Sequence, residues 1–151
     1  MKGGGGMRLR KTLLIAGTLF VILVISNQTS RGEDWTFLDE NEAGVHFYDQ
    51  ASITKTSQGN LLVRISQFPV PDLIETLEEL LPNTKGFSYM VSEDEIDCQH
   101  RVYKIRRIIY LNKNNQIIHD SAKEEKKYRP MDFRPIPKGT VIYRLTDIIC
   151  P

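Results

Sequence analysis

The chain has 151 residues, of which 40% are hydrophobic and 26% charged, and its formal net charge is +1. This length suits one folded domain of about 100 to 120 residues beside a separate N-terminal segment. The composition excludes the disordered and the collagen-like classes of protein.

The charges are unevenly divided along the chain, because every Asp and Glu lies at or after Glu33. Residues 33–97 hold 3 basic and 14 acidic side chains, whereas residues 98–151 hold 12 basic and 5 acidic ones. This division indicates either two solvated faces of opposite sign or two halves that attract each other across the fold.

The first 32 residues have the pattern of a targeting segment. Arg8, Arg10 and Lys11 stand directly before the apolar run Leu13–Ile25, and a polar stretch follows it. This order is typical of a secretory signal peptide. The run is short for a membrane-spanning helix, which needs about 20 apolar residues, but an uncleaved N-terminal anchor remains the alternative. We therefore predict a protein exported to an oxidising compartment, with membrane contact only through residues 1–32.

The chain has two cysteines, Cys98 and Cys150. In an oxidising compartment, two thiols far apart in the sequence usually form a structural disulfide. We therefore predict a disulfide between them.

Alternating apolar residues predict a β-meander in the first half of the folded part. Its strands are expected at Trp35–Leu38, Val45–Tyr48, Ile53–Thr56 and Leu61–Phe68, with a tight connection at Asp49–Ser52.

A helix is predicted next, with Asp72 as its cap and Pro82 as its stop. We expect it to pack against its own domain rather than against a partner. Phe87–Val91 is predicted as a short strand, and the acidic run Ser92–Glu95 as a turn. The apolar residues of the helix recur at helical spacing: Leu73, Ile74, Leu77, Leu80 and Leu81.

The segment Val102–Leu111 is predicted to be a bulged strand. Strict alternation would leave neither of its faces apolar, whereas a break in register at Arg106 or Arg107 would restore one. That face would hold Tyr103, Ile105, Ile108 and Tyr110.

After a turn at Asn112–Gln116, a return strand is expected at Ile117 and Ile118. Ser121–Arg129 is interpreted as a charged loop or a helical fragment. Thr140 is placed to cap an amphipathic terminal helix, which is expected to unwind as it reaches Cys150.

Several short motifs occur in a defined order along the chain. They are Trp35, Tyr48-Asp49-x-x-Ser52-Ile53, Ser92 followed by Asp97-Cys98, the Arg-rich strand through Tyr110, Pro137-x-Gly139-Thr140, and Cys150. Together they resemble the bacterial surface-adhesin protein E-like domains, over about Trp35–Cys150.

The resemblance implies an α+β domain at residues 33–151. Its antiparallel sheet would have about six strands, with the C-terminal helix packed across it and tied by the disulfide. The helix predicted after Asp72 would then be one extra short helix. The resemblance also implies an exported bacterial protein of the periplasm or cell envelope. Some members of the family bind host matrix or plasma proteins.

No motif in the sequence indicates an enzyme or a cofactor. His46, His100 and His119 are scattered, without the spacing of metal ligands. We therefore expect no metal and interpret the protein as a non-enzymatic binding or envelope-associated module. The alternative is a membrane-tethered periplasmic structural or assembly protein.

A binding face is predicted from the basic second half of the chain. Its ligand would be a host or envelope protein or an anionic glycan, whereas export and the acidic folded part disfavour nucleic acid. The alternative is that the basic side chains are solvated or paired with the acidic half. The residues concerned are Arg101, Tyr103, Lys104, Arg106, Arg107 and Tyr110.

Overall fold

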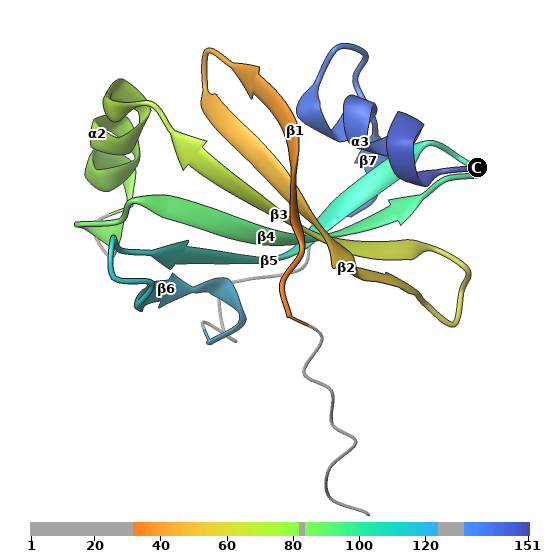
Figure 1. Cartoon of the computed structure of the whole chain (residues 1–151), viewed down its shortest axis with the longest axis horizontal. Helices are drawn as coiled ribbons and strands as arrows, with labels where there is room; N and C mark the ends of the chain where they lie inside the picture. The colour runs from red at the N-terminus through yellow and green to blue at the C-terminus, as the bar shows by residue number, and fades with distance from the viewer. Residues whose placement is uncertain (1–31, 82–83, 124–131) are drawn as a thin grey trace, which may run out of the picture. The chain divides into compact units, whose positions relative to one another are not determined.

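The computed structural model of the protein describes residues 32–81, 84–123 and 132–151. These residues form an antiparallel sheet in the order β1-β2-β3-β4-β5-β6, with β7 paired to β5 (Figure 1). Consecutive strands are neighbours, as expected where short turns connect them. The strands are β1 (Trp35–Asn41), β2 (Gly44–Lys55), β3 (Leu61–Pro69), β4 (Tyr89–Asp97), β5 (Val102–Leu111), β6 (Ile117–Asp120) and β7 (Arg134–Pro135).

Two α-helices and one 3-10 helix complete the described structure: α2 (Pro71–Leu80), η2 (Ser121–Lys123) and α3 (Val141–Ile149). The predicted α+β fold, with its C-terminal helix and one extra short helix, is confirmed. The predicted targeting segment, residues 1–32, lies outside the described residues except for Gly32. None of the helices in the described ranges is long and apolar enough to cross a membrane.

β2 runs straight through the tight connection predicted at Asp49–Ser52, so the prediction of two separate strands was wrong. A bulge absorbs the irregularity, since pairing with β3 resumes at Thr54 after Asp49. The Ser52 hydroxyl donates to the Asp49 carbonyl at 2.6 Å and accepts from the Arg64 N–H at 2.9 Å. These bonds satisfy backbone groups that the bulge would otherwise leave unpaired.

The acidic run Ser92–Glu95 lies inside β4, so the predicted turn was also wrong. Glu93 stands opposite Arg107 and Glu95 opposite Lys104 on β5. Opposite charges placed directly across a strand pair stabilise the sheet. The acidic run is therefore held as a strand by its basic partners on β5, which come later in the chain.

The bulge predicted in β5 is confirmed at Arg106. Glu93 pairs with Arg107 and Asp94 pairs with Ile105, which leaves Arg106 as the extra residue. The predicted apolar face is confirmed as well, because its residues pair with every second residue of β4 from Met90 to Ile96. Those residues of β5 are Tyr103, Ile105, Ile108 and Tyr110.

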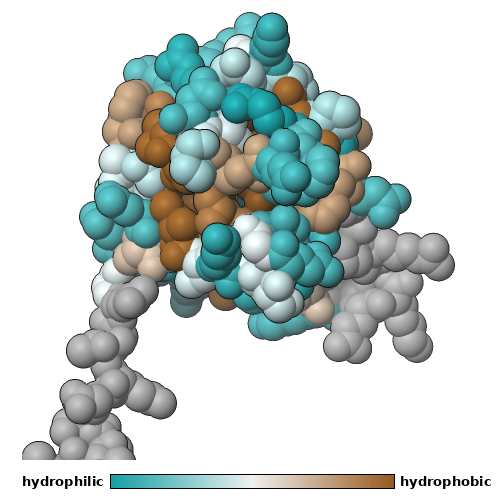
Figure 2. Space-filling model, turned by 90° about the vertical axis from the view of Figure 1, so that its right-hand side faces the viewer, coloured by the Kyte–Doolittle hydropathy of each residue, from teal (hydrophilic) through white to brown (hydrophobic). Residues whose placement is uncertain are grey.

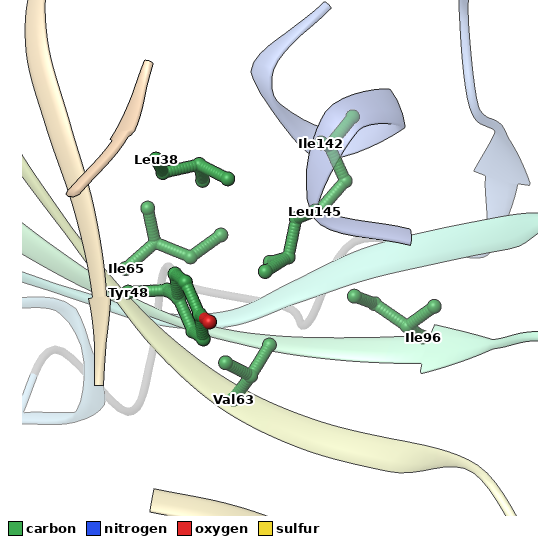
Figure 3. Packing of buried hydrophobic residues seen from close by; sticks show 7 residues of the cluster. All are labelled: Leu38, Tyr48, Val63, Ile65, Ile96, Ile142 and Leu145. Carbon is green, nitrogen blue, oxygen red and sulfur yellow. The ribbon is translucent and has the colours of Figure 1, made fainter. Parts of the chain in front are cut away.

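The core lies between α3 and one face of the sheet. Thr140 caps the helix as predicted, since its hydroxyl oxygen accepts from the N–H of Tyr143 at 3.3 Å. Ile142 and Leu145 of α3 belong to the core cluster, and Leu145 points toward the sheet (Figure 3). The sheet side of the cluster consists of Leu38, Tyr48, Val63, Ile65 and Ile96.

A disulfide ties α3 to the sheet, as predicted. Cys98 follows directly after β4, and Cys150 is the C-terminal cap of α3 in an extended conformation. Their Cα atoms are 5.6 Å apart. The helix thus ends where its cysteine meets the turn between β4 and β5.

Helix α2 differs from the prediction at its start. Its cap is Val70, without a side-chain hydrogen bond, and Pro71 rather than Asp72 opens the first turn. Pro82, the predicted stop, lies outside the described residues. Packing against the domain is partial, since Leu80 is 70% exposed and no residue of α2 is fully buried. Its half-buried apolar residues are Leu73, Ile74 and Leu77.

The core is thin and reaches the surface in places. From the side that faces right in Figure 1, apolar side chains gather in the middle of the surface and polar ones surround them (Figure 2). Ile53, Val141 and Ile149 pack against the core cluster but are only partly buried. The few fully buried residues, above all Leu145 and Ile96, therefore carry much of the packing.

Replacing Leu145 by alanine is expected to lower the free energy of unfolding by about 3 kcal/mol, because a fully buried leucine leaves a cavity. Urea unfolding of the purified chain measures this. The matched control is Ile148→Ala on the same helix, where Ile148 is 55% exposed and a loss of about 0.5 kcal/mol or less is expected. Equal losses for the two variants would contradict this packing of α3.

Candidate functional site

The face of the sheet opposite the core carries a row of alternating charges. Asp49 on β2 pairs with Arg64 on β3, which pairs with Glu93 on β4, which pairs with Arg107 on β5. Side chains of directly opposed residues lie on one face, with Cβ atoms about 5 Å apart. We call these four residues the charged row.

Each arginine of the charged row is anchored on a buried aspartate. Arg107 donates from Nε and Nη2 to the two carboxylate oxygens of Asp120, at 2.9 and 2.7 Å. Arg64 donates from Nε and Nη2 to Oδ2 of Asp49. The side chains of Asp49 and Asp120 are 0% and 2% exposed. Both guanidinium groups are therefore held in fixed positions.

The third nitrogen of each arginine faces a glutamate nearer the solvent. Nη1 of Arg64 lies 3.2 Å from Glu33, and Nη1 of Arg107 lies 3.3 Å from Glu93. These two glutamate side chains are 57% and 39% exposed. The accessible part of the site thus alternates between hydrogen-bond acceptors, on Glu33 and Glu93, and hydrogen-bond donors, on Arg64 and Arg107.

The arginines keep the buried aspartates ionised. Hydrogen bonds from Arg107 lower the pKa of Asp120 despite its burial, and Asp120 in turn raises the pKa of Arg107. Burial alone would raise the pKa of Asp49, but the N–H of Asp34 and the guanidinium of Arg64 lower it overall. Asp49 and Asp120 therefore stay ionised near neutral pH.

Small side chains beside the charged row leave a hollow in the sheet surface, which we call the trough. Ser66 and Val91 pair with each other across β3 and β4, between larger residues on either side. The cavity has a volume of about 570 Å³. Pockets for small organic ligands have volumes of about 300–1,000 Å³, so the trough is of ligand size.

The wall of the trough opposite the charged row is apolar. The rings of Phe68 and Tyr89 stack with centroids 4.9 Å apart and an interplanar angle of 15°. The Tyr89 hydroxyl donates to Oδ1 of Asn115 at 3.0 Å, which orients the ring. We call this wall the apolar row, and its residues are Phe68, Tyr89, Leu111 and Ile117.

A second charged cluster is centred on Glu95. Its carboxylate lies 3.1 Å from Nζ of Lys104 and 3.6 Å from Nη1 of Arg106, and it accepts from the amide of Asn60 at 2.8 Å. Burial would raise the pKa of Glu95, but the bonds from Asn60 and Lys104 lower it overall. The basic side chains here neutralise a buried carboxylate.

Asp94 faces the core and differs from its neighbours. It is 4% exposed, and Oδ1 has no hydrogen-bond partner among the described residues. Burial raises the pKa of Asp94 to about 7, although Ser92 and Arg134 partly oppose the shift. Within residues 32–81, 84–123 and 132–151, no group of three or more His, Cys, Asp or Glu side chains could hold a metal ion.

Residues 35–151 match the family model described as Surface-adhesin protein E. The chain belongs to this family. No curated protein and no solved structure matched the chain significantly. The family indicates a surface binding module with an exported or cell-surface location, and partners on a host or another surface.

In this protein E family member, the six residues of the predicted basic face do not share one surface. Arg101 binds α3, with Nη2 3.1 Å from Asp147 and its guanidinium over the ring of Tyr143. The guanidinium carbon of Arg134 lies over the ring of Tyr103, 4.8 Å from the ring centroid. Tyr110 is buried, in edge contact with Phe87 and His119.

The remaining three residues of that prediction fall into two groups. Lys104 and Arg106 belong to the Glu95 cluster, and only Arg107 lines the trough. The alternative interpretation was that the basic side chains pair with the acidic half of the chain. Lys104, Arg106 and Arg107 do so, since they form ion pairs with Glu95 and Glu93. A direct ligand-binding role for the six stays a prediction, and Arg107 is placed best for it.

Most residues of the trough could not be recognised from the sequence. Arg64 and Ser66 stand among apolar residues of β3 and point away from the core, which is the one local signal of a polar site on the other face. The partners of Arg64 lie 15 and 31 residues away along the chain, at Asp49 and Glu33. Cross-strand register brings these residues together, and no short motif encodes it.

Proposed function

We propose that the protein is a non-enzymatic, exported binding module that holds a host or envelope ligand in the trough. The observation that carries the proposal is the trough itself: a cavity of about 570 Å³ between the charged row and the apolar row. Sites that combine apolar walls with a few fixed polar groups are typical of ligand binding. Membership of the surface-adhesin protein E family supports a binding role.

The electrostatics of the trough support binding rather than catalysis. A general acid or base works best when its pKa lies near the working pH. The pKa values of Asp49 and Asp120 are lowered, so both carboxylates stay ionised and serve to hold the arginines. Asp94 has a pKa nearer to neutral, but it faces the core and not the trough.

A lysine placed on the apolar row tests the proposal. Ile117→Lys puts a charge on a rim residue that is 49% exposed, so the fold is expected to tolerate the change. Binding of the labelled full chain to epithelial cells and immobilised matrix proteins is expected to fall about tenfold or more. Unchanged binding by this variant would contradict the proposal.

The matched control is Ile148→Lys, on the outer side of α3, where Ile148 is 55% exposed. It adds the same charge at a similar exposure but away from the trough, and full binding is expected. Thermal unfolding of both variants, compared with the unchanged chain, separates a loss of binding from a loss of folding.

A second proposal concerns how the domain is held at the envelope. The basic residues Arg8, Arg10 and Lys11 before the apolar run Leu13–Ile25 support either a cleaved signal or a retained anchor. In the anchored case the protein would be a membrane-tethered periplasmic component with a structural or assembly role. Mass spectrometry of membrane fractions distinguishes the two, because an intact terminus at Met1 or Met7 requires the anchor.

A further inference from the structure

We propose that the ligand of the trough is a saccharide with an uncharged sugar ring, which lies between the charged row and the apolar row. This inference rests on the proposed function, because it names the chemistry of the ligand at the same site. It is carried by the order of polar groups along one wall, the aromatic character of the other wall, and the net charge of the cavity.

The polar wall matches a row of hydroxyl groups. This wall consists of Glu33 and the members of the charged row that line the trough. Along it, Glu33 accepts, Arg64 donates, Glu93 accepts and Arg107 donates, and salt bridges of 3.2 and 3.3 Å hold the two ion pairs. A sugar hydroxyl both donates and accepts, so neighbouring hydroxyls can bridge a carboxylate and a guanidinium. Hydrogen bonds to ionised groups are stronger than those between neutral groups, so fixed ion pairs favour such a ligand.

The apolar wall matches the other side of a sugar ring. The C–H groups on one face of a hexose form an apolar surface, which packs well against an aromatic side chain. Tyr89 and Phe68 line the cavity, and the hydrogen bond from Tyr89 to Asn115 holds the tyrosine ring in place. Preorganised rings lose little conformational entropy when a ligand binds.

The charge balance of the cavity argues against an anionic glycan. Two arginines that line the cavity, Arg64 and Arg107, pair with four carboxylates. Those of Glu33 and Glu93 line the cavity as well, and those of Asp49 and Asp120 are buried and add negative charge near it. A sulfate or a second carboxylate would therefore enter a site with a surplus of negative charge. An anionic glycan, which the basic second half of the sequence suggested, is thus disfavoured at this site.

A lysine or arginine side chain of a peptide is the competing ligand, because the surplus charge would attract it. Both accessible carboxylates, however, already pair with a guanidinium, which a cationic ligand would have to displace or approach closely. An uncharged polyhydroxylated ring is repelled neither by the carboxylates, as an anion would be, nor by the guanidinium groups, as a cation would be. The geometry therefore favours the neutral saccharide.

Trp35 provides a built-in reporter of the site. It is the single tryptophan of the sequence and lines the trough. Its Nε1 donates to Glu33 at 3.1 Å, and the guanidinium of Arg64 lies 5.7 Å from its ring centroid. A ligand that rearranges either partner is expected to change the fluorescence of this tryptophan.

The test uses the full chain and three immobilised sets of probes: neutral hexose and N-acetylhexosamine oligosaccharides, the same oligosaccharides with sialic acid or sulfate, and peptides rich in lysine and arginine. Probes that bind are then titrated in solution while Trp35 fluorescence is recorded. The trough variant is Tyr89→Ala, and the matched control is Phe133→Ala, a 38% exposed aromatic residue outside the trough.

At least one neutral oligosaccharide is expected to bind, with a saturable change in Trp35 fluorescence and weaker binding of its sialylated or sulfated form. Tyr89→Ala is expected to weaken this binding about tenfold, whereas Phe133→Ala leaves it unchanged. Binding that does not depend on Tyr89 would overturn the inference.

The inference and the proposed function fail in different ways. If only the basic peptides bind, and Tyr89→Ala weakens them, the saccharide is wrong and the trough remains the binding site. If no probe binds but Ile117→Lys reduces attachment to cells or matrix, the saccharide is again wrong, and the trough remains the binding site. If no probe binds and Ile117→Lys has no effect, both proposals fall.

Discussion

Replacing Cys98 and Cys150 together by serine is expected to lower the free energy of unfolding by about 4 kcal/mol. The disulfide closes a loop of 52 residues in sequence separation, and its loss gives the unfolded chain more conformational freedom. A loss of this size is a large part of the stability of a domain of about 120 residues. Chemical unfolding of the oxidised chain and of the double variant measures the difference.

A reductant provides the control for this experiment. It should destabilise the unchanged chain as much as the double substitution does, and it should not affect the double variant. Because Cys150 caps α3, the reduced chain is also expected to lose protection from hydrogen exchange in α3 before the sheet does. Equal stability of the oxidised and reduced chains would contradict the role of the disulfide.

Replacing Asp94 by asparagine is expected to stabilise the protein above neutral pH by as much as about 4 kcal/mol, from a shift of about three pKa units. Burial raises the pKa of this carboxyl from 3.8 to about 7. Between these two values the folded chain binds more protons at Asp94 than the unfolded chain does. The free energy of unfolding therefore falls as the pH rises through this window, and asparagine removes that fall.

Urea unfolding at pH 5 and pH 8 tests the role of Asp94. At pH 5 the variant should be more stable by about 1.5 kcal/mol, because the carboxyl is already largely ionised in the unfolded chain, and at pH 8 the difference should reach about 4 kcal/mol. Asp72→Asn, at the exposed start of α2, is the control and should show no such difference between the two pH values. A variant that is less stable than the unchanged chain at pH 8 would show that ionised Asp94 is compensated in the fold.

Below about pH 4 the free energy of unfolding is expected to fall as the pH falls, which is the opposite of the effect of Asp94. Asp49, Asp120 and Glu95 have lowered pKa values, so the stability that their ionised forms contribute is lost as the pH falls through those values. Stability is therefore expected to be greatest at mildly acidic pH, between the two effects.

Several features of the fold could be predicted because their causes are local in the sequence. Strict alternation along Val102–Leu111 would leave neither face of the strand apolar, whereas one extra residue restores an apolar face. The pattern therefore predicts the bulge found at Arg106. Thr140 before an amphipathic run predicts the capped helix α3, and two cysteines in an exported chain predict the disulfide.

Other features depend on residues far apart in the chain and could not be predicted in the same way. The acidic run Ser92–Glu95 has the composition of a turn, but cations on β5 hold it in a strand. The trough depends on the register of β2 to β6, which brings Arg64 beside Glu93 and both near Tyr89. A basic cluster in the sequence therefore indicated Arg107 but not the other members of the site.

The central claim is that ligands bind in the trough, and footprinting of aromatic side chains with hydroxyl radicals tests it most directly. The full chain is labelled with and without the neutral oligosaccharide or matrix protein that it binds most tightly, and modified residues are identified by mass spectrometry. We expect protection of Trp35, Phe68 and Tyr89, with no change at Phe133 and Tyr143. Protection of Phe133 or Tyr143, with the three trough residues unchanged, would contradict the claim.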